Sequence, residues 1–141
     1  MKEQETFLII SDKLSVSEKR QIIIHNMKLL QRCGFKFHAK VLGEMLAYCP
    51  LPSNKMKTFI NLPKRGKKGF LYRYVFKCAI KNNVPKIFID EVFNYKKFSD
   101  ENENKEYELY SKYTKLIIAV CQNAKSKQTR QRKLDEIFGN G

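Results

Sequence analysis

The chain has 141 residues, which is the length of one domain with a hydrophobic core of its own. Hydrophobic residues make up 43% and aromatic residues 12%, and this composition excludes a chain that is disordered throughout. Lys and Arg outnumber Asp and Glu by 28 to 14, which gives a net charge of +14. A chain with this charge attracts polyanions, so the candidate partners are nucleic acid, anionic lipid and an acidic protein.

Signals for a membrane or for an oxidising compartment are not found in the sequence. No apolar run approaches about 18 residues, and the acidic N-terminus lacks the basic and hydrophobic regions of a signal peptide. We therefore expect a cytoplasmic protein with no membrane partner. The cysteines form no C-x-x-C pair, so we expect free, buried thiols, no metal site and no cofactor. The four cysteines are Cys33, Cys49, Cys78 and Cys121.

The first predicted helix begins at a capping box. Ser15 and Glu18 have the spacing at which the serine side chain accepts from the backbone and the carboxylate reaches back. Apolar residues then recur at helical spacing up to Leu30, and Gly34 suits the left-handed backbone position that follows a helix. Ahead of this helix, the short apolar run over residues 6–10 fits either an edge strand or a tethered arm.

Two further helices are separated by a Pro-Leu-Pro turn. The apolar pattern predicts a helix over residues 37–49, which the prolines at 50–52 end because proline lacks the backbone N–H. A third, shorter helix begins with Ser53 or Asn54 as its cap, and Pro63 ends it. The first half of the chain therefore predicts three successive helices.

A window without acids dominates the charge distribution. Residues 61–86 carry eight Lys and Arg side chains and no Asp or Glu, which is more than half of the net charge of +14. The first part of this window, residues 64–69, has two glycines that allow a loop to bend close to a ligand. We predict a basic loop here, followed by a fourth helix over residues 70–82.

The fourth predicted helix carries a cationic stripe. Arg73, Lys77 and Lys81 recur every four residues, so they share one face. A solvated helix usually alternates opposite charges, because each such pair contributes about 0.2–0.5 kcal/mol. This helix has no acidic residue and therefore lacks the stabilisation from pairs of opposite charge. A bound polyanion is the simplest partner that would offset the repulsion between its cations. Among the interleaved aromatic residues only Tyr72 or Phe76 can share a side with the cations, and core packing is favoured over stacking on bases.

The last third of the chain changes from acidic to basic. Residues 87–93 fit a short helix better than a strand, and residues 90–108 carry a net charge of −4 and lead into a long helix. After this helix, residues 125–133 carry five cations and no acid, which predicts a solvated, flexible segment. The expected domain organisation is a single helical domain over residues 1–124 and a basic flexible tail over residues 125–141.

The predicted fold class is mainly α, a compact helical domain with a basic C-terminal tail. Three successive helices followed by a basic loop are typical of a winged helix-turn-helix domain, whose third helix enters the major groove of DNA. Asn54, Lys55 and Lys57 would then face base edges, and the basic loop would lie where a wing lies. The prolines in the turn and the lack of clear strands beside the loop leave two alternatives open, a different basic helical fold and a mixed α+β fold.

These features favour a nucleic-acid-binding protein without enzymatic activity. The two histidines have no carboxylate partner at a spacing that would orient them for catalysis. We expect a DNA-binding regulator or accessory factor, with DNA favoured over RNA, and a homodimer because most helix-turn-helix proteins bind paired half-sites. The alternatives are an RNA-binding assembly subunit of a ribonucleoprotein and an interaction protein that blocks a partner's nucleic-acid-binding surface. The candidate nucleic-acid contacts are Asn54, Lys55, Lys57, Lys64, Arg65, Lys67, Lys68, Arg73, Lys77, Lys81, Lys125, Lys127, Arg130 and Arg132.

Overall fold

The computed structural model describes residues 6–11, 13–36, 38–93 and 105–138. In these ranges the chain forms six helices and no strand, so the mainly α class is confirmed. The helices are α1 (Val16–Arg32), α2 (Ala39–Tyr48), α3 (Ser53–Ile60), α4 (Lys64–Lys81), α5 (Lys86–Phe93) and α6 (Lys105–Ile137). None of the helices in the described ranges has both the length and the apolar composition of a membrane span.

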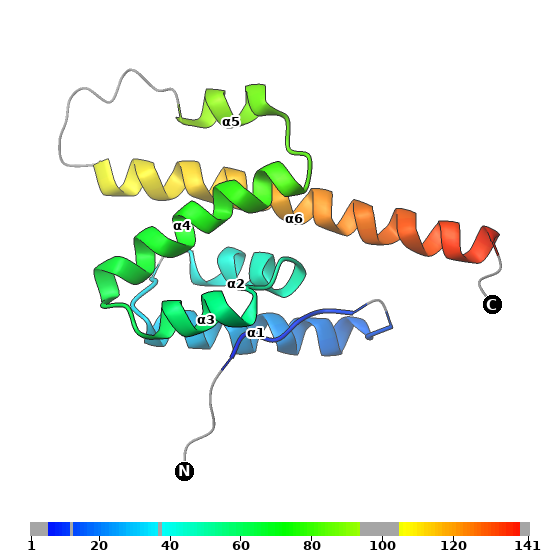
Figure 1. Cartoon of the computed structure of the whole chain (residues 1–141), viewed down its shortest axis with the longest axis horizontal. Coiled ribbons are helices and arrows are strands. Elements are labelled where there is room, and N and C mark those ends of the chain that lie inside the picture. The colour runs from blue at the N-terminus through cyan, green and yellow to red at the C-terminus, as the bar shows by residue number, and fades with distance from the viewer. Residues whose placement is uncertain (1–5, 12, 37, 94–104, 139–141) are drawn as a thin grey trace, which may run out of the picture.

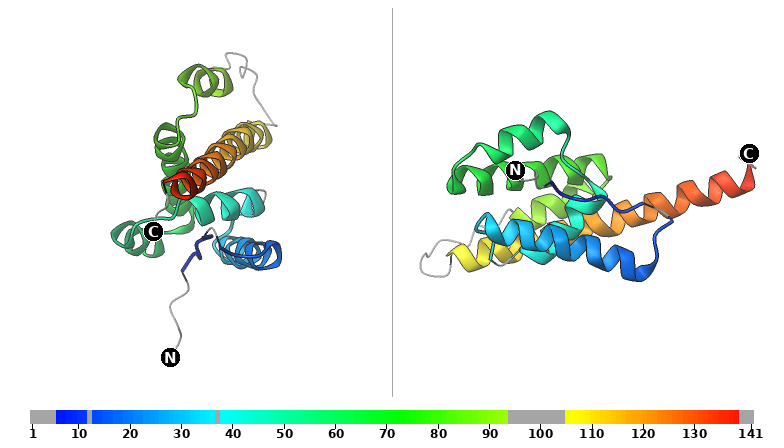
Figure 2. Two further views of the ribbon diagram at one scale, coloured as in Figure 1. Left: turned by 90° about the vertical axis from the view of Figure 1, so that its right-hand side faces the viewer. Right: turned by 90° about the horizontal axis from the view of Figure 1, so that it is seen from below.

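Helix α6 lies at the centre of the arrangement (Figure 1). Helices α2, α4 and α5 pack on it, while α1 lies on the outer side of α2 and α3 lies beside α4 (Figure 2). The core forms where α2, α4 and α6 meet, because each of them turns an apolar stripe inward. The fully buried side chains there are Leu42, Met45, Leu46, Leu71, Val75, Leu116, Ile117 and Val120.

The apolar run at the start of the chain is a tethered arm, which is one of the two arrangements that the sequence left open. Asn26, fully buried in α1, accepts from the N–H of Leu8 (2.8 Å) and donates to the Leu8 carbonyl oxygen (3.0 Å). It also donates to the carbonyl oxygen of Gly43 in α2 (3.1 Å). Phe7 packs against Phe59 of α3, with 6.0 Å between the ring centroids. The arm therefore ties the first three helices together.

Helix α1 begins and ends as the sequence predicts. Ser15 is its N-cap, with its hydroxyl oxygen accepting from the Glu18 N–H (3.1 Å) and the carboxylate accepting from the Ser15 N–H (2.8 Å). Gly34 has a φ of +98°, in the left-handed region. The close approach of α2 depends on Gly43, because a Cβ there would lie 3.0 Å from the backbone nitrogen of Met27.

Helix α3 is confirmed, but neither Ser53 nor Asn54 caps it. The N-cap is Pro52, whose φ of −61° and ψ of 157° already supply the extended backbone that precedes a helix. Since the chain is helical from Ser53 onward, Asn54 lies in the first turn and its Oδ1 accepts from the Lys55 N–H (2.9 Å). The predicted side-chain cap is therefore wrong.

Residues 64–69 form the first turns of α4, so the predicted basic loop is wrong. Pro63 has an extended backbone (φ −71°, ψ 166°) and serves as the N-cap. The ammonium group of Lys67 holds these turns against α3, because it donates to the carbonyl oxygens of Ile60 and Leu62. Such contacts offset the helix cost of the two glycines, about 1 kcal/mol each. With no strand in the described ranges, that part of the chain contains no wing.

The last two helices extend further than the sequence suggests. α5 is a helix, as favoured, and α6 runs for 33 residues through the segment predicted to be a flexible tail. No Gly or Pro lies between Lys105 and Ile137 to end it, and the expected domain boundary at residue 124 falls inside this continuous helix. Most of the predicted acidic segment, residues 94–104, lies outside the described residues.

Candidate nucleic-acid interface

The outer side of α4 carries a row of cations. Arg73, Lys77 and Lys81 are all exposed and, as predicted, share one face of the helix. On the opposite side, the buried residues Leu71 and Val75 hold α4 in the core. The row is about 12 Å long, because residues of an α-helix rise about 1.5 Å each.

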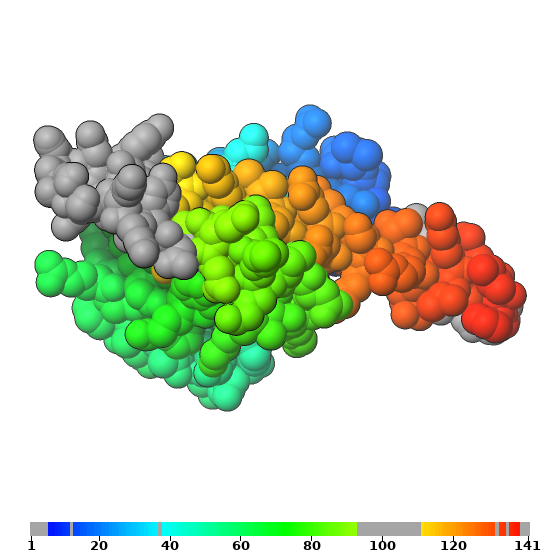
Figure 3. Space-filling view, turned by 90° about the horizontal axis from the view of Figure 1, so that it is seen from above, coloured from blue at the N-terminus to red at the C-terminus, as the bar shows by residue number. Residues whose placement is uncertain are grey.

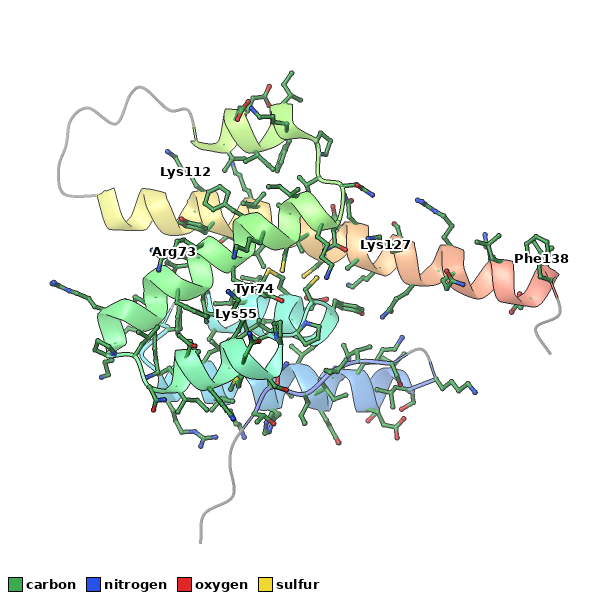
Figure 4. The ribbon with its side chains drawn as sticks, in the orientation of Figure 1. Lys55, Arg73, Tyr74, Lys112, Lys127 and Phe138 are labelled. Carbon is green, nitrogen blue, oxygen red and sulfur yellow. The ribbon has the colours of Figure 1, made fainter. Side chains whose placement is uncertain are left out.

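Lys127 of α6 extends this row beyond the end of α4. Its Nζ donates to the carbonyl oxygen of Lys81 at 3.1 Å, a group that has no partner within its own helix because α4 ends there. Figure 4 shows Arg73 on α4 and Lys127 on the part of α6 that continues away from the other helices. We call Arg73, Lys77, Lys81 and Lys127 the cationic face.

Carboxylates close in sequence do not cancel this charge. Residues 45–89 include ten Lys and Arg side chains and no Asp or Glu. The nearest acid before this range, Glu44, is paired with Lys125 at 2.8 Å, and the nearest after it, Asp90, with Lys86 at 3.5 Å. The cationic face therefore keeps its positive charge against these neighbours.

None of the four cations at the start of α4 belongs to the cationic face. Lys67 bonds to the end of α3, and its Nζ lies 5.7 Å from the centroid of an aromatic ring there, so it serves to hold α3 and α4 together. Arg65 is exposed and precedes Arg73 by eight residues, which places it about 80° around the helix from the cationic face. Lys64 and Lys68 precede Arg73 by nine and five residues, so they lie on other sides of the helix.

Of the three residues predicted to contact bases, Asn54 and Lys55 lie in the first turn of α3 and Lys57 lies in its last turn. Asn54 and Lys57 are exposed, whereas Lys55 is half-buried. The turn before α3 is fixed to α4, because the Tyr74 hydroxyl donates to the carbonyl oxygen of Pro50 at 2.6 Å. These side chains and the cationic face therefore belong to two neighbouring helices.

The aromatic residues of α4 pack in the core. Tyr72 is buried and stacks on Tyr113 of α6, with 4.0 Å between ring centroids and 19° between ring planes. Its hydroxyl lies 3.0 Å from Nδ1 of His38. Phe76 is half-buried and meets Tyr113 edge-on at 5.9 Å. Core packing is thus confirmed, and stacking of bases on Tyr72 is excluded.

In the C-terminal part of α6, only some of the side chains predicted to contact nucleic acid are both exposed and free of an ion pair. Lys125 is engaged with Glu44, whose carboxylate raises the pKa of Lys125 by accepting its hydrogen bond. Lys127 and Arg130 are exposed, while the side chain of Arg132 lies outside the described residues.

The thiols of Cys49 and Cys78 form a pair close to Lys81 and Lys127. The two cysteines are far apart in the chain, so no sequence pattern indicates this pair. All four cysteines are free, as expected, but only Cys78 and Cys121 are buried, whereas Cys33 and Cys49 are half-buried. A hydrogen bond with the Cys78 thiol lowers the pKa of Cys49 to about 7, and the same bond raises the pKa of Cys78. Asn82 Nδ2, 3.2 Å from the Cys49 sulfur, and the two lysine charges also lower the pKa of Cys49, whereas burial opposes them.

Other kinds of site have less support in the described residues. No group of three or more His, Cys, Asp or Glu side chains in those ranges is placed to hold a metal ion. Comparisons with protein-family models, with curated proteins and with solved structures find no match for this chain. The cationic face is thus the main guide to function.

Proposed function

We propose that this chain is a non-enzymatic nucleic-acid-binding protein whose cationic face holds a sugar-phosphate backbone. The observation that carries the proposal is the continuity of four exposed cations over α4 and the adjoining turn of α6. A B-form duplex carries one negative charge per about 1.7 Å of its axis, so a row about 12 Å long meets several phosphates. Cations that neutralise phosphates release counterions, which supplies affinity that is independent of sequence.

The specific form of this proposal is a DNA-binding regulator or accessory factor. Helices α2 and α3 follow each other across a short turn, as in a helix-turn-helix. Asn54 is exposed in the first turn of α3, which is where such proteins contact base edges, and Lys57 is exposed in the last turn of the same helix. Asparagine pairs with adenine and lysine with guanine. A homodimer that binds two half-sites belongs to the same proposal.

The test is a fluorescence-anisotropy titration of a labelled DNA duplex at several salt concentrations. The variant Arg73→Ala/Lys77→Ala/Lys81→Ala removes three cations from the face. Because each phosphate contact contributes about 0.9 to the slope of log K against log salt, we expect a slope that is shallower by about 2.7. We also expect affinity at low salt to fall by about tenfold or more.

The matched control is Arg20→Ala/Lys28→Ala/Lys40→Ala, which removes the same charge from exposed positions on α1 and α2. We expect the control to bind almost as tightly as the unsubstituted protein. Equal losses in the two variants would mean that net charge alone determines binding, and the proposal would be wrong. Equal affinity of the unsubstituted protein for RNA and DNA would replace the regulator with the RNA-binding assembly subunit.

A further inference from the structure

The C-terminal part of α6 projects beyond the other helices (Figures 1 and 3). Its buried stripe ends at Ala124, and every described side chain from Lys125 onward is exposed or half-buried. The helix continues to Ile137, which adds a length of about 20 Å. We call residues 125–133 the basic arm. Since none of the described side chains of the arm is buried, the core does not account for its composition.

Positive charge lies on more than one side of the basic arm. Residues 109–134 contain no Asp or Glu. Lys127, Arg130 and Lys133 are exposed and follow one another at three-residue intervals, so they are spread over about 120° of the helix circumference. In a groove that the helix enters, the middle of such an arc faces the floor and its two edges face the phosphates of the two walls.

We infer that the basic arm is a helix that enters the major groove of duplex DNA. The major groove of B-form DNA is about 12 Å wide and admits an α-helix, whose diameter with side chains is about 10–12 Å. The major groove of A-form RNA is too deep and narrow for side chains to contact its bases, and a single strand has no pair of walls. The inference rests on the proposed function and adds to it a second element, besides α3, that enters the groove.

The rest of the protein fixes the base of the arm on two sides. Lys127 joins it to the end of α4 through the bond to the Lys81 carbonyl oxygen (3.1 Å), and Lys125 joins it to Glu44 of α2 (2.8 Å). The arm therefore begins where the cationic face ends, and a duplex whose backbone lies along the face continues toward the arm. Arg130 has the forked donors that the O6 and N7 atoms of guanine accept, so we place it at a base edge.

The test compares three ligands of the full chain: a DNA duplex, an RNA duplex of the same sequence and the corresponding single-stranded DNA. The arm variant is Arg130→Ala/Lys133→Ala, and the matched control is Arg20→Ala/Lys28→Ala on α1. Alanine preserves helix propensity, which circular dichroism verifies. We expect the unsubstituted protein to prefer the DNA duplex over the RNA duplex by about tenfold or more. The arm variant should lose about tenfold for the DNA duplex and less than about threefold for the other two.

Protection of guanine N7 from dimethyl sulfate reports contact in the major groove directly. We expect protection by the unsubstituted protein and by the control, and loss of protection with the arm variant. Equal losses for the three ligands, or undiminished N7 protection by the arm variant, would overturn the inference and leave the proposed function standing. If Arg73→Ala/Lys77→Ala/Lys81→Ala weakens none of the three ligands, the proposed function itself fails.

Discussion

Gly69 lies in the segment of α4 that the sequence predicts to be a loop, so its replacement by alanine tests the helix there. A Cβ at Gly69 would have no atom within 4 Å, so Gly69→Ala meets no steric obstacle. In a helix interior alanine is more favourable than glycine by about 0.8–1.0 kcal/mol. We expect the substitution to raise the free energy of unfolding by about that amount.

Gly43 provides the matched control, because it also lies inside a helix but has no such space. A Cβ there would lie 3.0 Å from the backbone nitrogen of Met27 and 3.2 Å from the Cβ of Asn26. Displacing α1 would also strain the buried hydrogen bond from Asn26 to the Gly43 carbonyl oxygen (3.1 Å). Overpacking costs about 1–3 kcal/mol, which exceeds the gain in helix propensity, so we expect Gly43→Ala to destabilise the protein by about 1–2 kcal/mol.

Urea denaturation followed by circular dichroism measures both free energies of unfolding. In a thermal scan Gly69→Ala should raise Tm by about 3–5 °C. If Gly69→Ala leaves the free energy of unfolding unchanged while Gly43→Ala lowers it, residues 64–69 are not helical in solution. Arg65 would then have no fixed place beside the cationic face.

Two further predictions concern titration and charge near the interface. The rate at which iodoacetamide alkylates Cys49, measured by mass spectrometry, should increase with pH around a midpoint of about pH 7. The reason is that the lowered pKa of Cys49 keeps its thiolate populated at a pH where an ordinary thiol is protonated. The midpoint should move upward in Cys78→Ala, because this variant removes the hydrogen bond to Cys49. It should also move upward with saturating DNA, because the DNA neutralises the charge of Lys127. A midpoint near pH 9 in the unsubstituted protein would contradict the thiol pair. Glu44→Gln releases Lys125, so the slope of log K against log salt should steepen by about 0.9 while stability changes by less than about 1 kcal/mol. An unchanged slope would place Lys125 outside the interface.

Helices could be predicted where local chemistry determines them. The capping box at Ser15 and the left-handed Gly34 define α1 from sequence alone, and the apolar period of α6 identifies its buried stripe. The start of α4 could not be predicted, because two glycines and four cations are locally typical of a loop. Its helix is supported by bonds from Lys67 to the carbonyl oxygens of Ile60, the last residue of α3, and Leu62, and the apolar and charge patterns do not indicate these contacts.

Part of the candidate site could likewise be predicted from local sequence, and part of it could not. The row from Arg73 to Lys81 could be predicted, because a four-residue interval places side chains on one helix face. The addition of Lys127 could not, since 46 residues separate it from Lys81 and the contact exists only because α6 crosses the end of α4. Lys67 and Lys125 were predicted contacts that the fold engages internally, because the partners of a cation depend on which carbonyl or carboxylate lies beside it in space.

The absence of acids from α4 does not by itself require a ligand. Like charges four residues apart destabilise a helix by about 0.2–0.5 kcal/mol per pair, so the two pairs on the α4 row cost less than about 1 kcal/mol. On the other side of the helix Leu71 and Val75 are fully buried, and burial of such a side chain contributes about 1.5–3 kcal/mol. The core therefore outweighs the repulsion, and the compensation argued from the sequence is unnecessary. The proposal depends instead on position: Lys67 is half-buried against α3 and Lys125 is paired with Glu44, whereas the α4 row stays exposed. Lys127, which is exposed although it donates to the Lys81 carbonyl oxygen, continues the row toward the basic arm.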